Sequence, residues 1–219
     1  MEALTIIAPC GAGTCEAAQH SQSLEAWFLN TPGIKVAMPA TVYDCKGLLK
    51  TAIRDNNPVM FLEHELLYNS KGEVPEDPEF LLPFGNAEVK KEGKDITIVA
   101  YSRMTILALA AAEELEKEGI SCEVVDLRTL APLDTAAFVE SVKKTGRAVV
   151  VEECWRTCGL GAEICSRIYD GCFESLLAPV KRVSGLDVPM PYSRKLEKLC
   201  IPQVETITAA VKGLLSEKY

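Results

Sequence analysis

Short apolar runs alternate with stretches of helical spacing along most of the chain. The apolar runs predict strands, while the stretches between them place hydrophobic residues three and four positions apart, as one buried helix face requires. Continuous apolar strands between amphipathic helices indicate an α/β fold with a mainly parallel sheet covered on both faces. The predicted strands are 4–8, 34–38, 58–62, 96–101, 122–126, 148–152 and 179–183, and the predicted helices are 21–30, 41–55, 105–118, 134–144, 161–169 and 204–215.

The alternation is interrupted over residues 69–94. This stretch carries Pro75, Pro78 and Pro83 among many charged residues, a composition typical of a linker. We therefore expect an α/β unit at 1–68, a linker at 69–94 and a second α/β unit at 95–219. The second unit has a full set of alternating elements, whereas the first resembles a domain that lacks its beginning.

The composition of the 219 residues narrows the classes of partner. The net charge of −8 argues against a nucleic-acid surface, which needs clustered Lys and Arg. The longest stretch without a charged residue, 3–15, is too short to span a bilayer, and no signal-peptide pattern is visible. We therefore expect neither a nucleic acid nor a membrane as a partner.

Nine cysteines are present, and none forms a C-x-x-C pair. The spacing of Cys154 and Cys158 suits zinc if one helix carries both, but Cys154 closes an apolar run and Cys158 precedes Gly159. The alternative is that the cysteines are small buried residues in a reducing compartment, and the sequence favours it.

A glycine-rich turn and a histidine follow the first predicted strand. Gly11 and Gly13 lie in the turn, and His20 lies directly before a predicted helix. Ligands of α/β proteins bind at the carboxyl ends of the strands, and histidine can move protons near neutral pH. His20 is thus a candidate for catalysis, with simple helix capping as the alternative, whereas His64 at another strand end is expected to be structural.

Two further segments are candidates for ligand binding. Gly159 and Gly161 stand before a predicted helix, but the third glycine of a dinucleotide fingerprint is absent, so tight-turn glycines are the favoured interpretation. The helix that ends at 52–57 offers free carbonyls together with Asp55 and Asn57, which suits a cation. Taken alone, a helix end before a proline is the commoner explanation of that pattern.

Nine segments spread along the chain carry a family resemblance: 18–27 (AQHSQSLEAW), 31–36 (TPGIKV), 46–50 (KGLLK), 52–59 (AIRDNNPV), 101–103 (YSR), 151–153 (VEE), 159–164 (GLGAEI), 187–192 (DVPMPY) and 201–204 (IPQV). Together they resemble the beta subunits of the decarboxylating component of pyruvate dehydrogenase, and the resemblance covers essentially the whole chain. Branched-chain 2-oxo acid and acetoin dehydrogenases share much of the pattern, but 52–59 and 187–192 look most like the pyruvate enzyme.

The resemblance implies the second half of a thiamine diphosphate pyrimidine-binding domain followed by a transketolase-type C-terminal domain. In the family an alpha subunit holds the diphosphate through magnesium, two alpha and two beta subunits assemble with a contact between the betas, and the complex docks on a dihydrolipoamide acetyltransferase core. His20 matches the active-site histidine of the family. The potassium site of the family corresponds to Leu4, Ala52, Ile53, Asp55 and Asn57.

The chain departs from the family in two ways. The first third of a family subunit, which carries the glutamate that protonates the aminopyrimidine, has no counterpart before Leu4, so we assign no cofactor-binding residue here. Leu177 stands where some members carry an acid that contacts the core. The resemblance predicts oxidative decarboxylation of pyruvate with acetyl transfer to lipoyl groups; the rival hypothesis is a non-catalytic assembly module. A bacterial source implies the cytoplasm, and a eukaryotic source implies an organellar matrix.

Overall fold

The first of two sheets is built mainly from the amino-terminal part of the chain. The computed structural model describes residues 3–217. The strand order is β1–β3–β2–β7, in which β1 and β2 run parallel to β3 and β7 runs antiparallel to β2. Helix α3 packs its buried Leu48 and Ala52 on Phe61 of β3. The elements are β1 (Thr5–Cys10), β2 (Lys35–Ala37), β3 (Val59–His64), β7 (Thr129–Ala131), α2 (Glu25–Leu29), α3 (Val42–Arg54) and the short 3₁₀ helix Glu65–Leu67.

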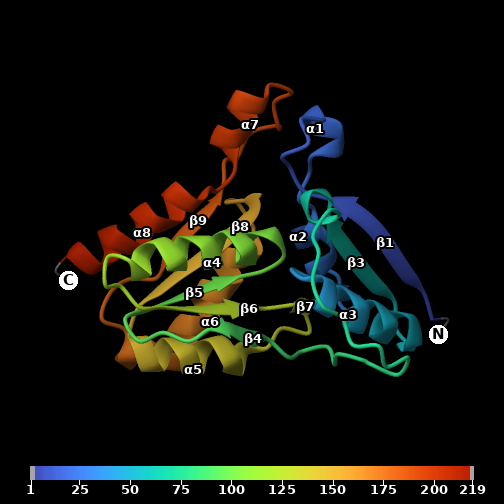
Figure 1. Cartoon of the computed structure of the whole chain (residues 1–219), viewed down its shortest axis with the longest axis horizontal. Coiled ribbons are helices and arrows are strands. Elements are labelled where there is room, and N and C mark those ends of the chain that lie inside the picture. Colours follow the sequence, from blue (N-terminus) through green and yellow to red (C-terminus); the bar gives the residue numbers. More distant parts are fainter. Residues whose placement is uncertain (1–2, 218–219) are drawn as a thin grey trace.

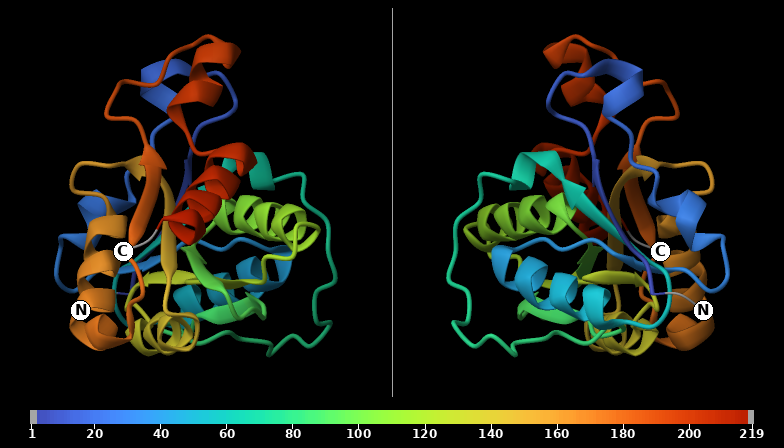
Figure 2. Two further views of the ribbon diagram at one scale, coloured as in Figure 1. Left: turned by 90° about the vertical axis from the view of Figure 1, so that its left-hand side faces the viewer. Right: turned by 90° about the vertical axis from the view of Figure 1, so that its right-hand side faces the viewer.

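The second sheet has the order β4–β6–β5–β8–β9, with parallel pairing except between β4 and β6. Helices α4 and α8 cover one face and α5 and α6 cover the other (Figure 1 and Figure 2). The predicted mainly parallel α/β fold is therefore confirmed. The elements are β4 (Glu88–Lys91), β5 (Ile96–Ala100), β6 (Cys122–Asp126), β8 (Ala148–Trp155), β9 (Lys181–Gly185), α4 (Arg103–Glu116), α5 (Thr135–Thr145), α6 (Leu160–Cys172), α8 (Val204–Ser216) and the 3₁₀ helix Phe173–Ser175.

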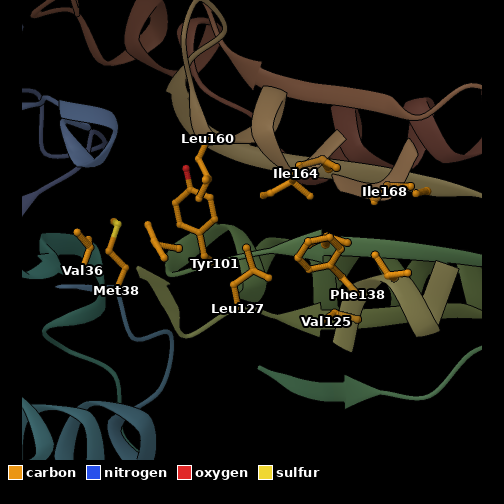
Figure 3. Packing of buried hydrophobic residues seen from close by; sticks show 14 of the residues in the cluster. Val36, Met38, Tyr101, Val125, Leu127, Phe138, Leu160, Ile164 and Ile168 are labelled. Atoms are coloured by element: carbon orange, nitrogen blue, oxygen red, sulfur yellow. The ribbon is translucent and has the colours of Figure 1, made fainter. Parts of the chain in front are cut away.

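One hydrophobic cluster joins the two sheets. Figure 3 shows Tyr101 and Leu127 between Met38 of the first sheet region and Phe138 of α5. All four side chains are at most 3% exposed. Because burial of each large apolar side chain contributes about 1.5–3 kcal/mol, this shared core holds the two sheets as one packed body.

Local sequence determines where the helices begin and end. Thr41 caps α3 by accepting a hydrogen bond from Asp44 N at 3.1 Å, and Asp55 ends the helix in an extended conformation. Asp134 caps α5 in the same way, and Gly146 ends it with φ of +70°. These signals explain why both helices lie close to the predicted bounds.

Other elements differ from the sequence predictions. The helix expected at 21–30 begins only at Glu25, and the short helix α1 (Ala17–His20) precedes it. Strand β4 lies inside the expected linker 69–94, and its Glu88, Lys90 and Lys91 give an edge strand the charged character that discourages wrong pairing. The division at 68 and 94 stays a prediction.

Helix α7 (Arg194–Cys200) was also absent from the sequence prediction. It lies beside α1, and the two helices project together from one end of the molecule (Figure 1 and Figure 2). Within residues 3–217, no helix is both long enough and apolar enough to cross a membrane.

Candidate functional site

His20 ends α1 on the projecting tip and is exposed. The loop before it runs through Gly11 and Gly13, whose φ angles of +92° and +117° favour glycine. Cys15 and Ala17 also have positive φ, at +65° and +61°. Such backbone costs roughly 1–3 kcal/mol for a residue with a side chain and persists only where surrounding contacts impose it.

The carboxylate of Glu153 lies buried beneath this loop, at the carboxyl end of β8. Its Oε1 accepts hydrogen bonds from Ala12 N at 2.7 Å and Ser23 Oγ at 3.1 Å. Its Oε2 lies 3.0 Å from His64 Nε2 and 3.2 Å from Arg103 Nη1. Burial raises the pKa of Glu153, but the hydrogen bonds from His64 and Ala12 and the charge of Arg103 outweigh it, so the pKa is lowered overall.

His64 is buried, with both ring nitrogens paired. Leu66 N donates to Nδ1 at 3.2 Å, so the proton of the neutral ring lies on Nε2, which faces Glu153. A Cβ on Gly11 would approach that Nε2 to 2.3 Å, so the glycine is required by close packing as well as by its φ angle. His64 is thus buried with its hydrogen bonds satisfied, as expected, and its purely structural role stays a prediction.

A second buried carboxylate, Glu25 of α2, lies near Glu153. Tyr101 donates a hydrogen bond to Glu25 Oε1 at 2.7 Å, while Oε2 is buried without a hydrogen-bond partner among the described residues. Burial raises the pKa of Glu25 to about 7, against the opposing effect of the Tyr101 hydrogen bond. Glu25 therefore exchanges a proton near neutral pH inside the boundary between the two sheets.

We expect Glu25 to make the chain less stable as pH rises from about 4.5 to about 7. The pKa is raised from 4.5 to about 7 in the fold, so the folded state binds the proton more tightly, and the preference is lost at higher pH. The shift corresponds to about 3 kcal/mol in the free energy of unfolding. Urea unfolding of wild type and Glu25→Gln at about pH 5 and about pH 8 measures it.

Relative to wild type, the free energy of unfolding of Glu25→Gln should be higher at about pH 8 than at about pH 5. Asp126, whose pKa burial also raises to about 7, is common to both proteins and cancels in the comparison. A difference that does not vary with pH would contradict the assignment to Glu25.

The glycines at the start of α6, Gly159 at its cap and Gly161 in its first turn, are closely packed, as expected for tight-turn glycines. Gly161 N donates to Glu152 Oε2 at 2.6 Å, and Glu152 also pairs with Arg182. A Cβ on Gly159 or Gly161 would meet a neighbouring atom at 2.4 Å. The amino end of this helix is therefore occupied by a carboxylate of the chain itself.

The end of α3 brings together the residues expected around potassium. The Ala52 carbonyl accepts hydrogen bonds from Thr5 Oγ1 at 2.9 Å and Asp55 N at 3.2 Å, and the Leu4 carbonyl accepts one from Val59 N at 2.8 Å. Asn57 lies against the side chain of Asp55, with its backbone N and its Nδ2 each 2.8 Å from Oδ1.

The carboxylate of Asp55 also pairs with the Lys35 ammonium, which lowers its pKa against the effect of burial. Within residues 3–217, no three His, Cys, Asp or Glu side chains are grouped to hold a metal. A cation here would depend on backbone carbonyls: that of Leu4 keeps a second lone pair beside its hydrogen bond from Val59, whereas that of Ala52 already accepts two hydrogen bonds. Ile53 lies next to them in the chain, with its side chain 62% exposed.

Neither glycine-rich loop of the described chain fits a diphosphate. Gly11 N donates to Gln22 O at 3.0 Å and Ala12 N to Glu153. Gly13 N and Cys15 N donate to Glu197 Oε1 of α7 at 2.9 and 3.2 Å. These four N–H groups already bind carboxylates and a carbonyl of the chain itself. They are therefore not available to bind the oxygens of a diphosphate.

The chain matches two family models that follow each other along the sequence. Residues 1–71 match the transketolase pyrimidine binding domain, and residues 85–207 match the transketolase C-terminal domain.

Similar curated proteins come from plants, bacteria and animals. The pyruvate dehydrogenase E1 component subunit beta-2, mitochondrial, of Oryza sativa subsp. japonica is 50% identical over 207 residues, which are 93% of this chain and 55% of the relative. The subunit beta of Rhizobium meliloti is 49% identical over 94% of this chain and 45% of its own length. The mitochondrial subunit beta of Mus musculus is 50% identical over 95% and 59%. The chain thus spans about half the length of the curated relatives it matches.

A solved structure with the same fold is titled a split gene transketolase, inactive beta4 tetramer. The TM-score is 0.76 at 32% sequence identity, over 98% of this chain and 67% of that one. With its two sheets matched by successive domain models, this chain belongs to the transketolase family.

Proposed function

We propose that the chain is the beta subunit of the decarboxylating component of pyruvate dehydrogenase. That component oxidatively decarboxylates pyruvate and transfers the acetyl group to a lipoyl group, which leads to acetyl-CoA. The observation that carries the proposal is the identity of about 50% to such subunits across more than nine tenths of this chain. The exposed His20 on a loop that buried carboxylates support is consistent with it.

In this proposal an alpha subunit completes the site, in a tetramer of two alpha and two beta subunits. Thiamine diphosphate, held by the alpha subunit through magnesium, supplies the carbon nucleophile when bound. The imidazole of His20 gives a proton to, or stabilises negative charge on, the reacting 2-oxo acid or acetyl group. The Gly11–Cys15 backbone contributes by fixing the place of that imidazole.

The test is reconstitution with an alpha subunit and the remaining beta sequence found in the relatives, followed by turnover of pyruvate, branched-chain 2-oxo acids and acetoin. Preferred turnover of pyruvate supports the proposal. Preference for another substrate would indicate a sister enzyme. The rival candidate, an assembly module without activity, predicts binding to alpha but no turnover by the chain itself.

We expect the chain alone to show no measurable binding of thiamine diphosphate. Its loop N–H groups are already paired, and the family glutamate for the aminopyrimidine has no counterpart in the sequence. The loss of one charge-assisted hydrogen bond costs about 1.5–3 kcal/mol, and the loss of the diphosphate anchor adds to this cost. Isothermal titration with magnesium and the cofactor measures the binding. A micromolar Kd for the lone chain would contradict the expectation.

We also propose potassium at the end of α3, held by carbonyls of the Leu4, Ala52 and Ile53 region with Asp55 and Asn57. Potassium should raise the melting temperature by a few degrees, as about 1 kcal/mol of binding energy does for a domain of this size. Thermal melts in potassium chloride and in tetramethylammonium chloride at equal ionic strength measure the effect. Equal midpoints would argue against a structural ion.

The proposal includes docking on a dihydrolipoamide acetyltransferase core. Leu177 is 59% exposed, and its N–H donates to Gly146 O at 2.8 Å. A leucine thus lies on the surface at the position where some family members carry an acid that contacts the core. For the compartment, we propose the bacterial cytoplasm or an organellar matrix, in line with the bacterial and mitochondrial relatives.

A further inference from the structure

The loop that carries His20 is held at both of its ends by one buried side chain. It follows β1, which ends at Cys10, and leads into α2, and its Ala12 N and Ser23 Oγ both donate to Glu153 Oε1, at 2.7 and 3.1 Å. The hydrogen bond from Gly11 N to Gln22 O closes the base of the loop at 3.0 Å. Glu153 belongs to β8 of the second sheet, so that sheet fixes the base of a loop from the first.

The middle of the loop is held by a second carboxylate, Glu197 of α7. Its Oε1 accepts from Gly13 N at 2.9 Å and from Cys15 N at 3.2 Å, and Oε2 lies 3.2 Å from Cys15 Sγ. Glu197 is only 2% exposed although α7 lies on the projecting tip. The same stretch has positive φ at Cys15 and Ala17, so its shape depends on contacts from outside the loop.

We propose that Glu153 and Glu197 are positioning residues that fix the place of His20 for the reaction. The inference rests on the proposed function, because it assigns to His20 the work described there. Among the described residues, no hydrogen bond or ion pair joins either carboxylate to the imidazole of His20. Each acts through the loop backbone, and a displacement of about 1 Å of a reacting group can cost 10²-fold in rate.

Glutamine can replace one of the two carboxylates but not the other, and this difference provides a test. Glu197 accepts hydrogen bonds from two backbone N–H groups through one oxygen, which a glutamine side chain can still do. Glu153 faces the Nε2–H of His64 and the Arg103 guanidinium with its other oxygen. A glutamine there would place an N–H₂ group against two donors. Glu153→Gln should therefore no longer hold the loop in place, whereas Glu197→Gln should hold it as the wild type does.

The first measurement follows the loop directly, in the complex with an alpha subunit. We expect faster amide exchange over residues 11–23 in Glu197→Ala and Glu153→Gln, and wild-type exchange in Glu197→Gln. Glu205→Ala, an exposed acid on α8, is the matched control and should leave exchange unchanged. Wild-type exchange in Glu197→Ala would overturn the proposal, whatever the substrate of the enzyme proves to be.

The second measurement is a double-mutant cycle in the reconstituted enzyme. Glu197→Ala should lower kcat by about 10- to 100-fold, and Glu197→Gln should restore it. In a His20→Ala background the same change should have almost no effect, because a residue that acts through His20 has nothing left to position. Equal losses in both backgrounds would show a merely structural role and overturn the proposal. Absence of pyruvate turnover in the wild type would instead overturn the proposed function.

Discussion

Replacement of His20 by alanine is expected to lower acetyl transfer in the assembled enzyme by about 10²- to 10⁴-fold, the range for loss of a proton-transfer group. Assembly and folding should not change, because the His20 side chain is exposed at the end of α1 and is outside the hydrophobic clusters of the fold. Steady-state kinetics with pyruvate and a lipoyl acceptor, together with size-exclusion chromatography, measure both properties.

Gln19→Ala is the matched control, since Gln19 is the exposed neighbour in the same short helix. It should retain the wild-type kcat. If His20→Ala also retained wild-type kinetics, His20 would be removed from the site, and the resemblance that assigns its role would fail at this residue.

Arg182→Ala is expected to destabilise the fold by about 3–5 kcal/mol, the cost of leaving a buried charge without its partner. Glu152 is fully buried, and its pairs are the Arg182 guanidinium and the backbone N–H of Gly161. Burial raises the pKa of Glu152 and Arg182 counteracts this, so loss of the arginine drives the carboxyl toward its protonated form. Urea unfolding monitored by circular dichroism measures the change.

Arg156→Ala provides the control, because Arg156 is exposed and binds the backbone oxygen of Arg182. Its effect should stay within about 0.5 kcal/mol, as for most surface substitutions. Similar losses for the two arginines would mean that the buried pair contributes no more than a surface contact does.

Much of the fold could be predicted from the sequence because its signals are local. The helix expected at 41–55 occurs as Val42–Arg54, since Thr41 caps one end and the proline at 58 limits the other. The strand Thr129–Ala131 could not be found, because it has three residues and forms only by antiparallel pairing with a strand more than ninety positions earlier. Short α7 exposes Leu196 and Leu199 and buries Glu197 and Cys200, so its apolar residues do not mark the buried face.

The candidate site was predictable only in part. His20 has a local signal, a glycine-rich turn after a strand, and a family resemblance. Glu153 and Glu197 were missed because the backbone N–H groups of Ala12 and Gly13 that they bind lie more than 140 positions away in the sequence. A signal for one of them existed: Glu152 and Glu153 directly follow the apolar run 148–151, and charged residues toward the carboxyl end of a buried strand are candidates for a site.

Strand β7 restricts how this chain can exchange parts with its relatives. It lies in the carboxyl-terminal half of the sequence, yet it completes the first sheet through Val36, and Met38 N donates to Arg128 O at 3.0 Å. A recombination event that joins the first half of one homologue to the second half of another must therefore preserve the β2–β7 register. If the two halves came from different homologues, the mismatch would fall within a sheet rather than in a linker. We therefore expect the two halves of the sequence to diverge together.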